Sequence, residues 1–380
     1  MKWETYKLKQ LCSEIVDCVN KTAPTSDVPT PYKMLRTSDI REGKINLENL
    51  NCVTKEVYEK WTRRGKLQKG DVIFTREAPL GEVGLVREEK NYFLGQRLVL
   101  FRANNKMCDG RFLMYSLLWH DNKQAIISKG VGSTVAHLRV PECENIEIKV
   151  PDLDVQHRIA DILSAYDDLI ENNQKQIKLL EEAARRLYKE WFVDLRFPGH
   201  ENTKIVDGVP EGWSRGLLKE LISVNYGKDH KKAPDDGNIP VYGSGGLMRK
   251  CNKSLFSGEA VLIPRKGSLN NIMYVDETFW TVDTMFYATM KQPHTAVFVY
   301  FFVKAFDMYS MNIGAAVPSM TAKILDAMDV VIPDKETLEK FDKREKVYFN
   351  KIKTLHGQNE RLKTARDLLL PKLMSGEVKV

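Results

Sequence analysis

Residues 132–151 read GSTVAHLRVPECENIEIKVP and residues 314–333 read GAAVPSMTAKILDAMDVVIP, one pattern written twice at a shift of 182 positions. Without a gap, the match continues through a long charged helical pattern, which ends in KEWF at residues 189–192 and in PKLM at residues 371–374. Leu138 falls on Met320 in this alignment. The repeat predicts two related modules, each followed by a helix, and such a chain suits a target with two half-sites.

The composition sets bounds on the class of protein. The 380 residues are 43% hydrophobic and 29% charged, which suits two globular domains of ordinary size. No apolar run reaches the roughly 18 residues of a membrane span, and the N-terminal MKWETYKLKQL lacks the apolar core of a signal peptide. We therefore expect a cytoplasmic protein without a membrane partner. The net charge of +7 permits a nucleic-acid partner but does not require one.

Short β-like runs followed by a helix-like apolar stretch occur in both halves and predict an α+β fold of two tandem mixed α/β domains. A stretch rich in glycine, proline and polar residues, FPGHENTKIVDGVPEGW, begins at Phe197 and predicts an exposed connection. The predicted boundaries are 1–150 for the first domain, 151–195 for its helix, 196–212 for the linker, 213–333 for the second domain and 334–380 for its helix.

Apolar residues recur at alternating steps of three and four in both helices, which predicts a heptad seam. Each helix has one apolar stripe and needs a partner, and the simplest partner is the other helix. An antiparallel register in which paired residue numbers sum to 532 sets Asn173 opposite Asn359. A seam asparagine is costly unless it finds a partner, so we predict this contact; the alternative is that both asparagines are solvated. The predicted antiparallel coiled coil uses Leu163, Ile170, Asn173, Ile177, Leu180, Ile352, Leu355, Asn359, Leu362 and Leu369.

Motifs for chemistry are missing from the sequence. There is no GxxxxGK[ST] phosphate loop, no Asn/Asp-Pro-Pro-aromatic motif and no acidic pair followed by Glu-x-Lys. Six cysteines and seven histidines have no metal-ligand spacing. The GSGG at residues 243–246 does not open an amphipathic helix, so it favours a loop over a nucleotide site. We expect no catalytic residues, no metal and no cofactor on this chain.

DNA binding would require cations near phosphates and side chains that reach base edges. Arg76 and Arg265 are the most promising pair, because each follows a strand-like run at an equivalent place. The candidates in the first module are Lys33, Arg36, Arg63, Arg64, Arg76, Ser133, Thr134, His137 and Arg139. The candidates in the second are Lys228, Lys231, Lys232, Arg249, Arg265, Lys266, Ser268, Asn270, Asn271 and Ser319. The alternative for each is a solvated charge or a structural turn.

Several phrases, in this order and spacing, carry a resemblance to a known family. They are GSTVAHLR at residues 132–139, WFVDLRFPGHEN at 191–202, VPEGW at 209–213, IPVYGSGG at 239–246 and LLLPKLMSGEV at 368–378. Over nearly its full length the chain resembles the specificity subunit of type I restriction-modification systems.

The resemblance implies a non-catalytic, sequence-specific DNA-binding subunit. Each module would be a target-recognition domain for one half of a bipartite DNA site, and the helices would set the gap and dock two methyltransferase subunits. Restriction/translocase subunits would complete the complex, and S-adenosylmethionine would be bound by the methyltransferase, which extrudes the target adenine. The alternatives are a coiled-coil adaptor that does not read DNA and, disfavoured by the missing motifs, an autonomous nuclease or methyltransferase.

Overall fold

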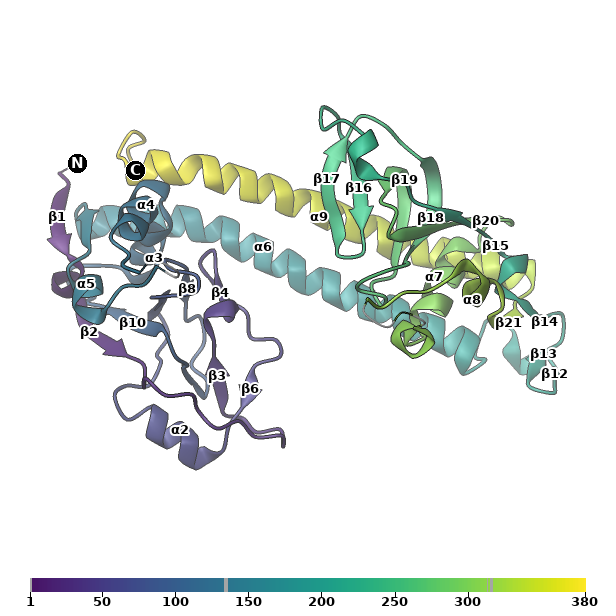
Figure 1. The fold of residues 1–380 in the computed structure, drawn as a ribbon, viewed down its shortest axis with the longest axis horizontal. Coiled ribbons are helices and arrows are strands. Elements are labelled where there is room, and N and C mark those ends of the chain that lie inside the picture. Colours follow the sequence, from purple (N-terminus) through teal and green to yellow (C-terminus); the bar gives the residue numbers. More distant parts are fainter. Residues whose placement is uncertain (1, 133–135, 313, 315–316) are drawn as a thin grey trace. The chain divides into compact units, whose positions relative to one another are not determined.

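The computed structural model describes residues 2–132, 136–312, 314 and 317–380 (Figure 1). The chain forms two compact units, Met1–Asn173 with Gly357–Val380 (unit 1) and Gln174–His356 (unit 2). Both units draw on the two long helices, α6 (Leu153–Tyr188) and α9 (Lys335–Met374). The division therefore passes through each helix, whereas the boundaries predicted from the sequence follow the helix ends.

Unit 1 is built on an antiparallel sheet of order β2-β10-β7-β8. Its inner strands β7 and β10 are mainly apolar and are buried almost throughout, because both of their faces are covered. A second sheet has the order β6-β3-β9, in which β3 and β9 are parallel. The elements before α6 are β1 (Glu4–Lys7), α1 (Leu8–Leu11), β2 (Cys12–Asp17), β3 (Lys33–Leu35), η1 (Thr37–Asp39), β4 (Ile40–Arg41), β5 (Lys44–Ile45), β6 (Asn51–Cys52), α2 (Lys55–Trp61), β7 (Val72–Thr75), β8 (Val83–Leu85), β9 (Tyr92–Leu94), β10 (Leu98–Ala103), α3 (Gly110–Leu118), α4 (His120–Ser128), α5 (Val140–Glu144) and β11 (Glu147–Val150).

Unit 2 is built on one six-stranded sheet of order β15-β20-β18-β19-β16-β17. The apolar helix α7 covers this sheet and has almost all of its side chains buried. The elements between α6 and α9 are η2 (Lys189–Val193, a π-helical turn), η3 (His200–Asn202), β12 (Ile205–Val206), β13 (Val209–Pro210), β14 (Ser214–Leu217), η4 (Leu218–Glu220), β15 (Ile222–Tyr226), η5 (His230–Lys232), β16 (Ile239–Gly243), β17 (Gly246–Cys251), β18 (Phe256–Pro264), β19 (Met273–Thr281), β20 (Met285–Met290), α7 (Ala296–Lys304), η6 (Met308–Met311), α8 (Ala322–Asp326) and β21 (Asp329–Ile332).

The repeat in the sequence is a repeat of topology. The order β15-β20-β18-β19 in unit 2 matches β2-β10-β7-β8 in unit 1. The last strand of each unit pairs with a strand near its start, β11 with β1 in unit 1 and β21 with β14 in unit 2. Strand β16 pairs in parallel with β19 and antiparallel with β17, as β3 does with β9 and β6. The two units therefore share one strand plan.

Unit 1 carries additional structure in two connections. Residues 36–50 form η1 and the β4–β5 hairpin, and residues 53–71 contain α2. The matching connections in unit 2, residues 244–245 and 252–255, are short turns and bends. Relative to unit 2, unit 1 therefore carries an insertion that includes a helix and a hairpin.

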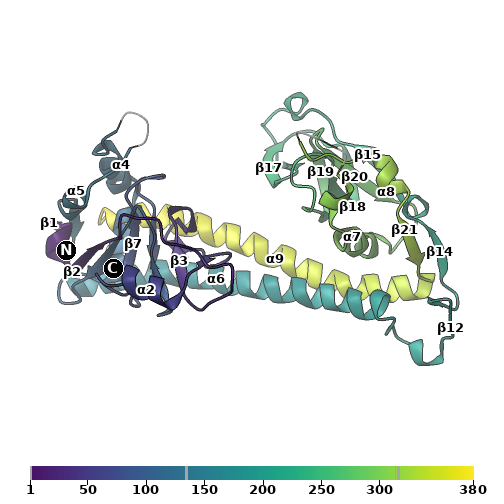
Figure 2. The same cartoon turned by 60° about the horizontal axis from the view of Figure 1, so that its bottom comes forward.

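Within unit 1, the first part of α6 lies beside the last part of α9 in both views (Figures 1 and 2). Asn173 Nδ2 donates a hydrogen bond of 2.9 Å to Asn359 Oδ1, which is the contact predicted from the heptad register. Asp167, which precedes Asn173 in α6, accepts a hydrogen bond from Arg366, which follows Asn359 in α9. The two segments therefore run antiparallel. Asp167 also accepts from Tyr115 Oη of α3 at 2.5 Å, which ties both helices to the globular part of unit 1.

Within unit 2, the last part of α6 and the first part of α9 join the main core. Phe341 of α9 meets Tyr188 of α6 with ring centroids 6.3 Å apart, and meets Phe192 edge-on at 4.7 Å. Trp191 is buried in the same cluster. These aromatic residues are packing residues, because their rings fill the space between the helices and the sheet.

In the described part of the chain, no helix has both the length and the apolar character needed to cross a membrane.

Candidate nucleic-acid interface

The turn after β7 in unit 1 is held between two segments that are distant in sequence. The Arg76 N–H donates to the Arg97 carbonyl at 2.8 Å, and the Arg76 carbonyl accepts from the Leu138 N–H at 3.0 Å. Glu77 and His137 form an isolated antiparallel bridge beside these bonds. The turn, the loop before β10 and the loop before α5 therefore meet at one end of the sheet.

The turn after β18 in unit 2 makes the equivalent backbone hydrogen bonds. The Arg265 N–H donates to the Thr284 carbonyl at 2.8 Å, and the Arg265 carbonyl accepts from the Met320 N–H at 2.9 Å. Lys266 and Ser319 form the matching bridge. The two arginines paired in the sequence analysis therefore occupy equivalent backbone positions.

The side chains of the two arginines are used differently. Arg76 is only 17% exposed, and its guanidinium donates to Asp17 Oδ1 at 2.9 Å and to the Leu138 carbonyl at 3.2 Å. Arg265 lies over the ring of Tyr226, 5.5 Å from its centroid, and donates once to the Asp283 carbonyl at 3.2 Å. Arg76 therefore holds its turn in place. Arg265 keeps guanidinium donors that have no partner among the described residues and are available to a ligand.

A polar pocket of about 280 Å³ opens beside the Arg76 turn of unit 1. It is lined by Asn20, Arg76, Glu77, Gln96, Arg97, His137 and Leu138. Arg76 and His137 are predicted from the sequence as candidates, whereas Asn20, Gln96 and Arg97 are not. The available signal was the turn Gly95-Gln96-Arg97 immediately before a strand-like run, a place where exposed polar side chains often bind ligands.

Three other candidate side chains in unit 1 form hydrogen bonds with residues of the same unit. Lys33 Nζ lies 2.9 Å from Cys52 Sγ, and this hydrogen bond lowers the pKa of the Cys52 thiol. Arg36 forms a fork with both oxygens of Asp39, at 3.0 and 2.8 Å. Arg64 donates to a backbone carbonyl at the end of β2 at 2.9 Å. All three side chains stabilise the insertion and its contact with the sheet.

The remaining candidates in unit 1 lie at the surface or outside the described residues. Arg63 is exposed and has no side-chain partner among the residues that the structure describes. Arg139 is 74% exposed and pairs with Glu142 at the start of α5. Ser133 and Thr134 lie outside the described residues. Arg63 is therefore the clearest free cation among these candidates.

A group of basic residues surrounds η5 in unit 2. Lys228, Lys231 and Lys232 have exposed side chains. Arg249 is 23% exposed and donates to the Ala233 carbonyl at 2.7 Å, and also pairs with Asp235. The three lysines can face a polyanion, whereas Arg249 fixes the turn that carries them.

The turn after Arg265 combines exposed and anchoring side chains. Lys266 and Ser268 are exposed. Asn270 Nδ2 donates to Asp307 at 2.9 Å, and Asn271 Nδ2 donates to the Ser244 carbonyl at 2.9 Å. The Ser319 backbone N–H donates to a side chain in the loop after η6. The two asparagines therefore hold the turn against the β16–β17 hairpin and η6.

The described residues contain no group of three or more side chains with metal-binding geometry. Burial raises the pKa of the Cys143 thiol to about 12, so this thiol is a packing group rather than a nucleophile. The fold therefore repeats one arginine-bearing turn at the same place in two related modules.

The model of the family described as type I restriction modification DNA specificity domain matches residues 1–182 and 210–364. The chain belongs to this family. Its members are specificity subunits, which act within a complex and are not its catalytic subunits, so family membership confirms the predicted non-catalytic class.

Curated relatives cover most of the chain. The type I restriction enzyme MjaIX specificity subunit of Methanocaldococcus jannaschii is 25% identical over 356 residues, which cover 82% of this chain and 78% of the relative. The HindI specificity subunit of Haemophilus influenzae is 22% identical and covers 90% of this chain and 94% of the relative. The crystal structure of the type I S subunit from M. genitalium matches with a TM-score of 0.63 at 19% identity, covering 98% of this chain and 96% of that one. This likeness confirms the predicted fold class of tandem mixed α/β domains with long helices.

Proposed function

We propose that this chain selects the DNA sequence for a type I restriction-modification complex and that each unit reads one half of a bipartite site. The observation that supports the proposal is the turn that both units share, in which Arg76 and Arg265 make equivalent backbone hydrogen bonds. Exposed cations lie on or beside both turns, Arg97 and Arg139 in unit 1 and Lys266 in unit 2, and such cations suit binding to phosphates. Two equivalent sites with different surrounding side chains suit a target whose halves differ in sequence.

The helices would fix the gap between the half-sites. We propose that α6 and α9 pair along their lengths as an antiparallel coiled coil, a pairing that the Asn173–Asn359 hydrogen bond supports by fixing the register. At 1.5 Å per residue, a helix the length of α6 extends about 54 Å. A rigid helical pair of that length would restrict the number of base pairs tolerated between the two halves.

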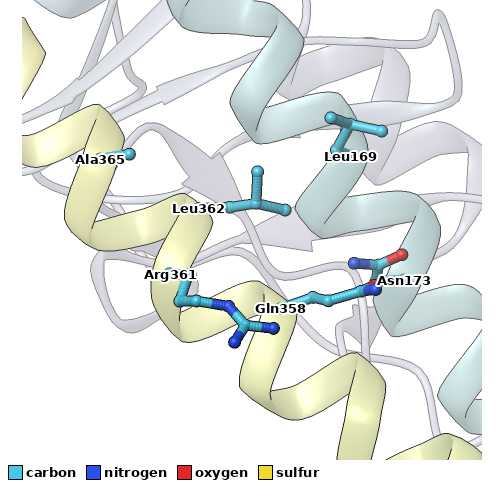
Figure 3. A pocket seen from close by; sticks show the side chains of 6 residues that line it. All are labelled: Leu169, Asn173, Gln358, Arg361, Leu362 and Ala365. Carbon is cyan, nitrogen blue, oxygen red and sulfur yellow. The ribbon is translucent and has the colours of Figure 1, made fainter.

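The same helices would dock the two methyltransferase subunits. In unit 1, α6 and α9 border a groove of about 430 Å³, lined by Leu169, Asn173, Gln358, Arg361, Leu362 and Ala365. Leu362 extends from α9 toward α6 in this groove (Figure 3), and Leu169 is 52% exposed. Exposed aliphatic side chains around a groove suit an apolar partner surface. We propose that one methyltransferase subunit inserts an apolar side chain here.

In this proposal, the chain recognises DNA and its partner subunits carry out the chemistry. The methyltransferase would bind S-adenosylmethionine, this chain would bind no cofactor, and restriction/translocase subunits would join the same complex in the cytoplasm.

The test is selection from a random DNA pool by the chain assembled with its methyltransferase. Enrichment of a two-part motif with a fixed gap is the expected result. Absence of any enriched motif would favour an adaptor that does not read DNA. Methylation or cleavage of DNA by the purified chain alone would contradict the non-catalytic assignment.

A further inference from the structure

The polar pocket of unit 1 contains hydrogen-bond donors that the fold does not use. Arg97 is 52% exposed, and its Nε lies 3.2 Å from Glu77 Oε2 in an ion pair. Its guanidinium donates no hydrogen bond to a described residue, so the outer edge of the fork is open. Gln96 Oε1 accepts from Thr22 at 3.1 Å, and the Gln96 amide nitrogen has no partner in the described chain. Asn20 offers a further exposed amide at the same mouth.

Arg97 occupies a backbone conformation that favours glycine. Its φ is +68°, in the left-handed region that non-glycine residues rarely adopt and that costs about 1–2 kcal/mol. The backbone at this position needs only a carbonyl for the Arg76 N–H, which a glycine would supply. Nothing in the backbone hydrogen bonding requires an arginine here, so the side chain is the feature to explain.

The equivalent positions of unit 2 carry different chemistry. Thr284 supplies the carbonyl that Arg97 supplies in unit 1, and Asp283 precedes it as Gln96 precedes Arg97. The backbone bonds of the turn are repeated, whereas an amide and a guanidinium are replaced by a carboxylate and a hydroxyl. Positions that keep the scaffold but exchange polar side chains are suited to give two half-sites different sequences.

We propose that Gln96 and Arg97 determine the base preference of unit 1 and that Arg97 reads a guanine through its N7 and O6 atoms. The inference rests on the proposed function and specifies one of its contacts. A guanidinium whose Nε side is fixed by a carboxylate presents two parallel donors, which match the two acceptors of guanine in the major groove. Thr284 has no such fork, so unit 2 reads no guanine from the equivalent position.

The test uses the full chain assembled with its methyltransferase subunit and the variants Arg97→Gly and Arg97→Lys. Glycine suits the left-handed backbone, so this variant keeps the fold while it removes the side chain. Lysine keeps the positive charge but cannot form the two-donor fork. The readout is the set of methylated adenines in a DNA library, together with competition binding to sites altered at one base pair.

Both variants are expected to lose selectivity at one G·C pair in one half of the motif and to leave the other half unchanged. The loss of discrimination at that pair should be about 5- to 150-fold, the range for a good bidentate base contact. Arg41→Ala is the matched control, because it removes an exposed arginine of unit 1 that lies outside the pocket lining and is not among the candidate DNA-binding residues. This control should leave the motif unchanged, and the thermal unfolding temperature should show that all variants are folded.

Two outcomes would overturn the inference while preserving the proposed function. One is a bipartite motif in the wild-type chain that Arg97→Gly leaves unaltered. The other is an equal loss of affinity for all sequences, which would mark Arg97 as a phosphate contact. If the wild-type complex enriches no two-part motif, the proposed function itself fails, so the two failures are distinguishable.

Discussion

Most arginines at the candidate interface donate to carboxylates or carbonyls of their own unit. Arg76 and Arg249 are 17% and 23% exposed and fix turns, whereas Arg265 retains free donors. A sequence shows where charges are but not which carboxylates they meet, because these contacts join segments far apart in the chain. Arg76 and Asp17 are one example. This is why the candidate residues could be named in advance but not sorted into anchors and ligand-binding groups.

Arg265→Ala should weaken DNA binding in the half-site read by unit 2. The guanidinium over Tyr226 is held in place by the ring and by one carbonyl, and its remaining donors face no described partner. If it contacts a base, the loss should be about 1–3 kcal/mol and confined to one half of the motif. Binding of the assembled complex to sites altered in either half measures this effect. An equal loss in both halves would contradict a base contact.

Glu345→Leu should stabilise the protein at pH 8 more than at pH 5. The Glu345 carboxylate is completely buried in unit 2 and has no hydrogen-bond partner among the described residues. Burial raises its pKa to about 8, from an ordinary value of 4.5 for a glutamate side chain. Between these values the folded state holds a proton that the unfolded state has lost, so stability falls as the pH rises through this window.

The expected gain at pH 8 is about 1–3 kcal/mol in the free energy of unfolding, since leucine removes an uncompensated buried charge. Urea denaturation at the two pH values measures it. Glu339→Leu is the control, because Glu339 is an exposed glutamate of the same helix. An equal gain at both pH values would show that Glu345 does not titrate in this window.

At the level of elements, local pattern predicted the inner strands and both long helices. β7, β10, β18 and β20 are runs of β-branched and aromatic residues, and their identity depends on neighbours in sequence. The heptad periodicity also predicted the contact of Asn173 with Asn359, because a seam restricts which residues can meet. The pairing of β1 with β11 and of β14 with β21 was not predicted. It joins segments more than a hundred residues apart, and neither strand's local pattern specifies its partner.

The Asn173–Asn359 contact should contribute measurably to the stability of unit 1. Asn359→Ala leaves the buried Asn173 amide without its partner, and Asn173→Ala does the same to the half-buried Asn359 amide; each should cost about 1–2 kcal/mol. The double variant should cost less than the sum, since it removes both amides. A double-mutant cycle in urea gives the coupling energy. Strict additivity would show that the hydrogen bond does not stabilise the fold.

At the level of the whole molecule, both units depend on the same two helices. Insertion of one heptad after Asn173 and another after His356 keeps the seam periodic and lengthens both helices by about 10 Å. The tolerated gap between half-sites should widen by about three base pairs. Sequencing of the methylated motif gives the gap directly.

Insertion into one helix alone is the control, because it breaks the pairing and should reduce stability instead of changing the gap. An unaltered gap in the doubly lengthened chain would contradict a spacing role for the helices.

Unit 1 is assembled from the two ends of the chain, and unit 2 is nested between them. Leu373 and Met374, near the last residue, belong to the same hydrophobic core as Leu8 and Leu11. During translation the module made first therefore stays incomplete until the tail leaves the ribosome, while the module made second can close earlier. Unit 2 would then complete its fold before unit 1, although unit 1 begins first in the sequence. A stop codon shortly before Leu373 would remove part of the core of unit 1 and destabilise that unit.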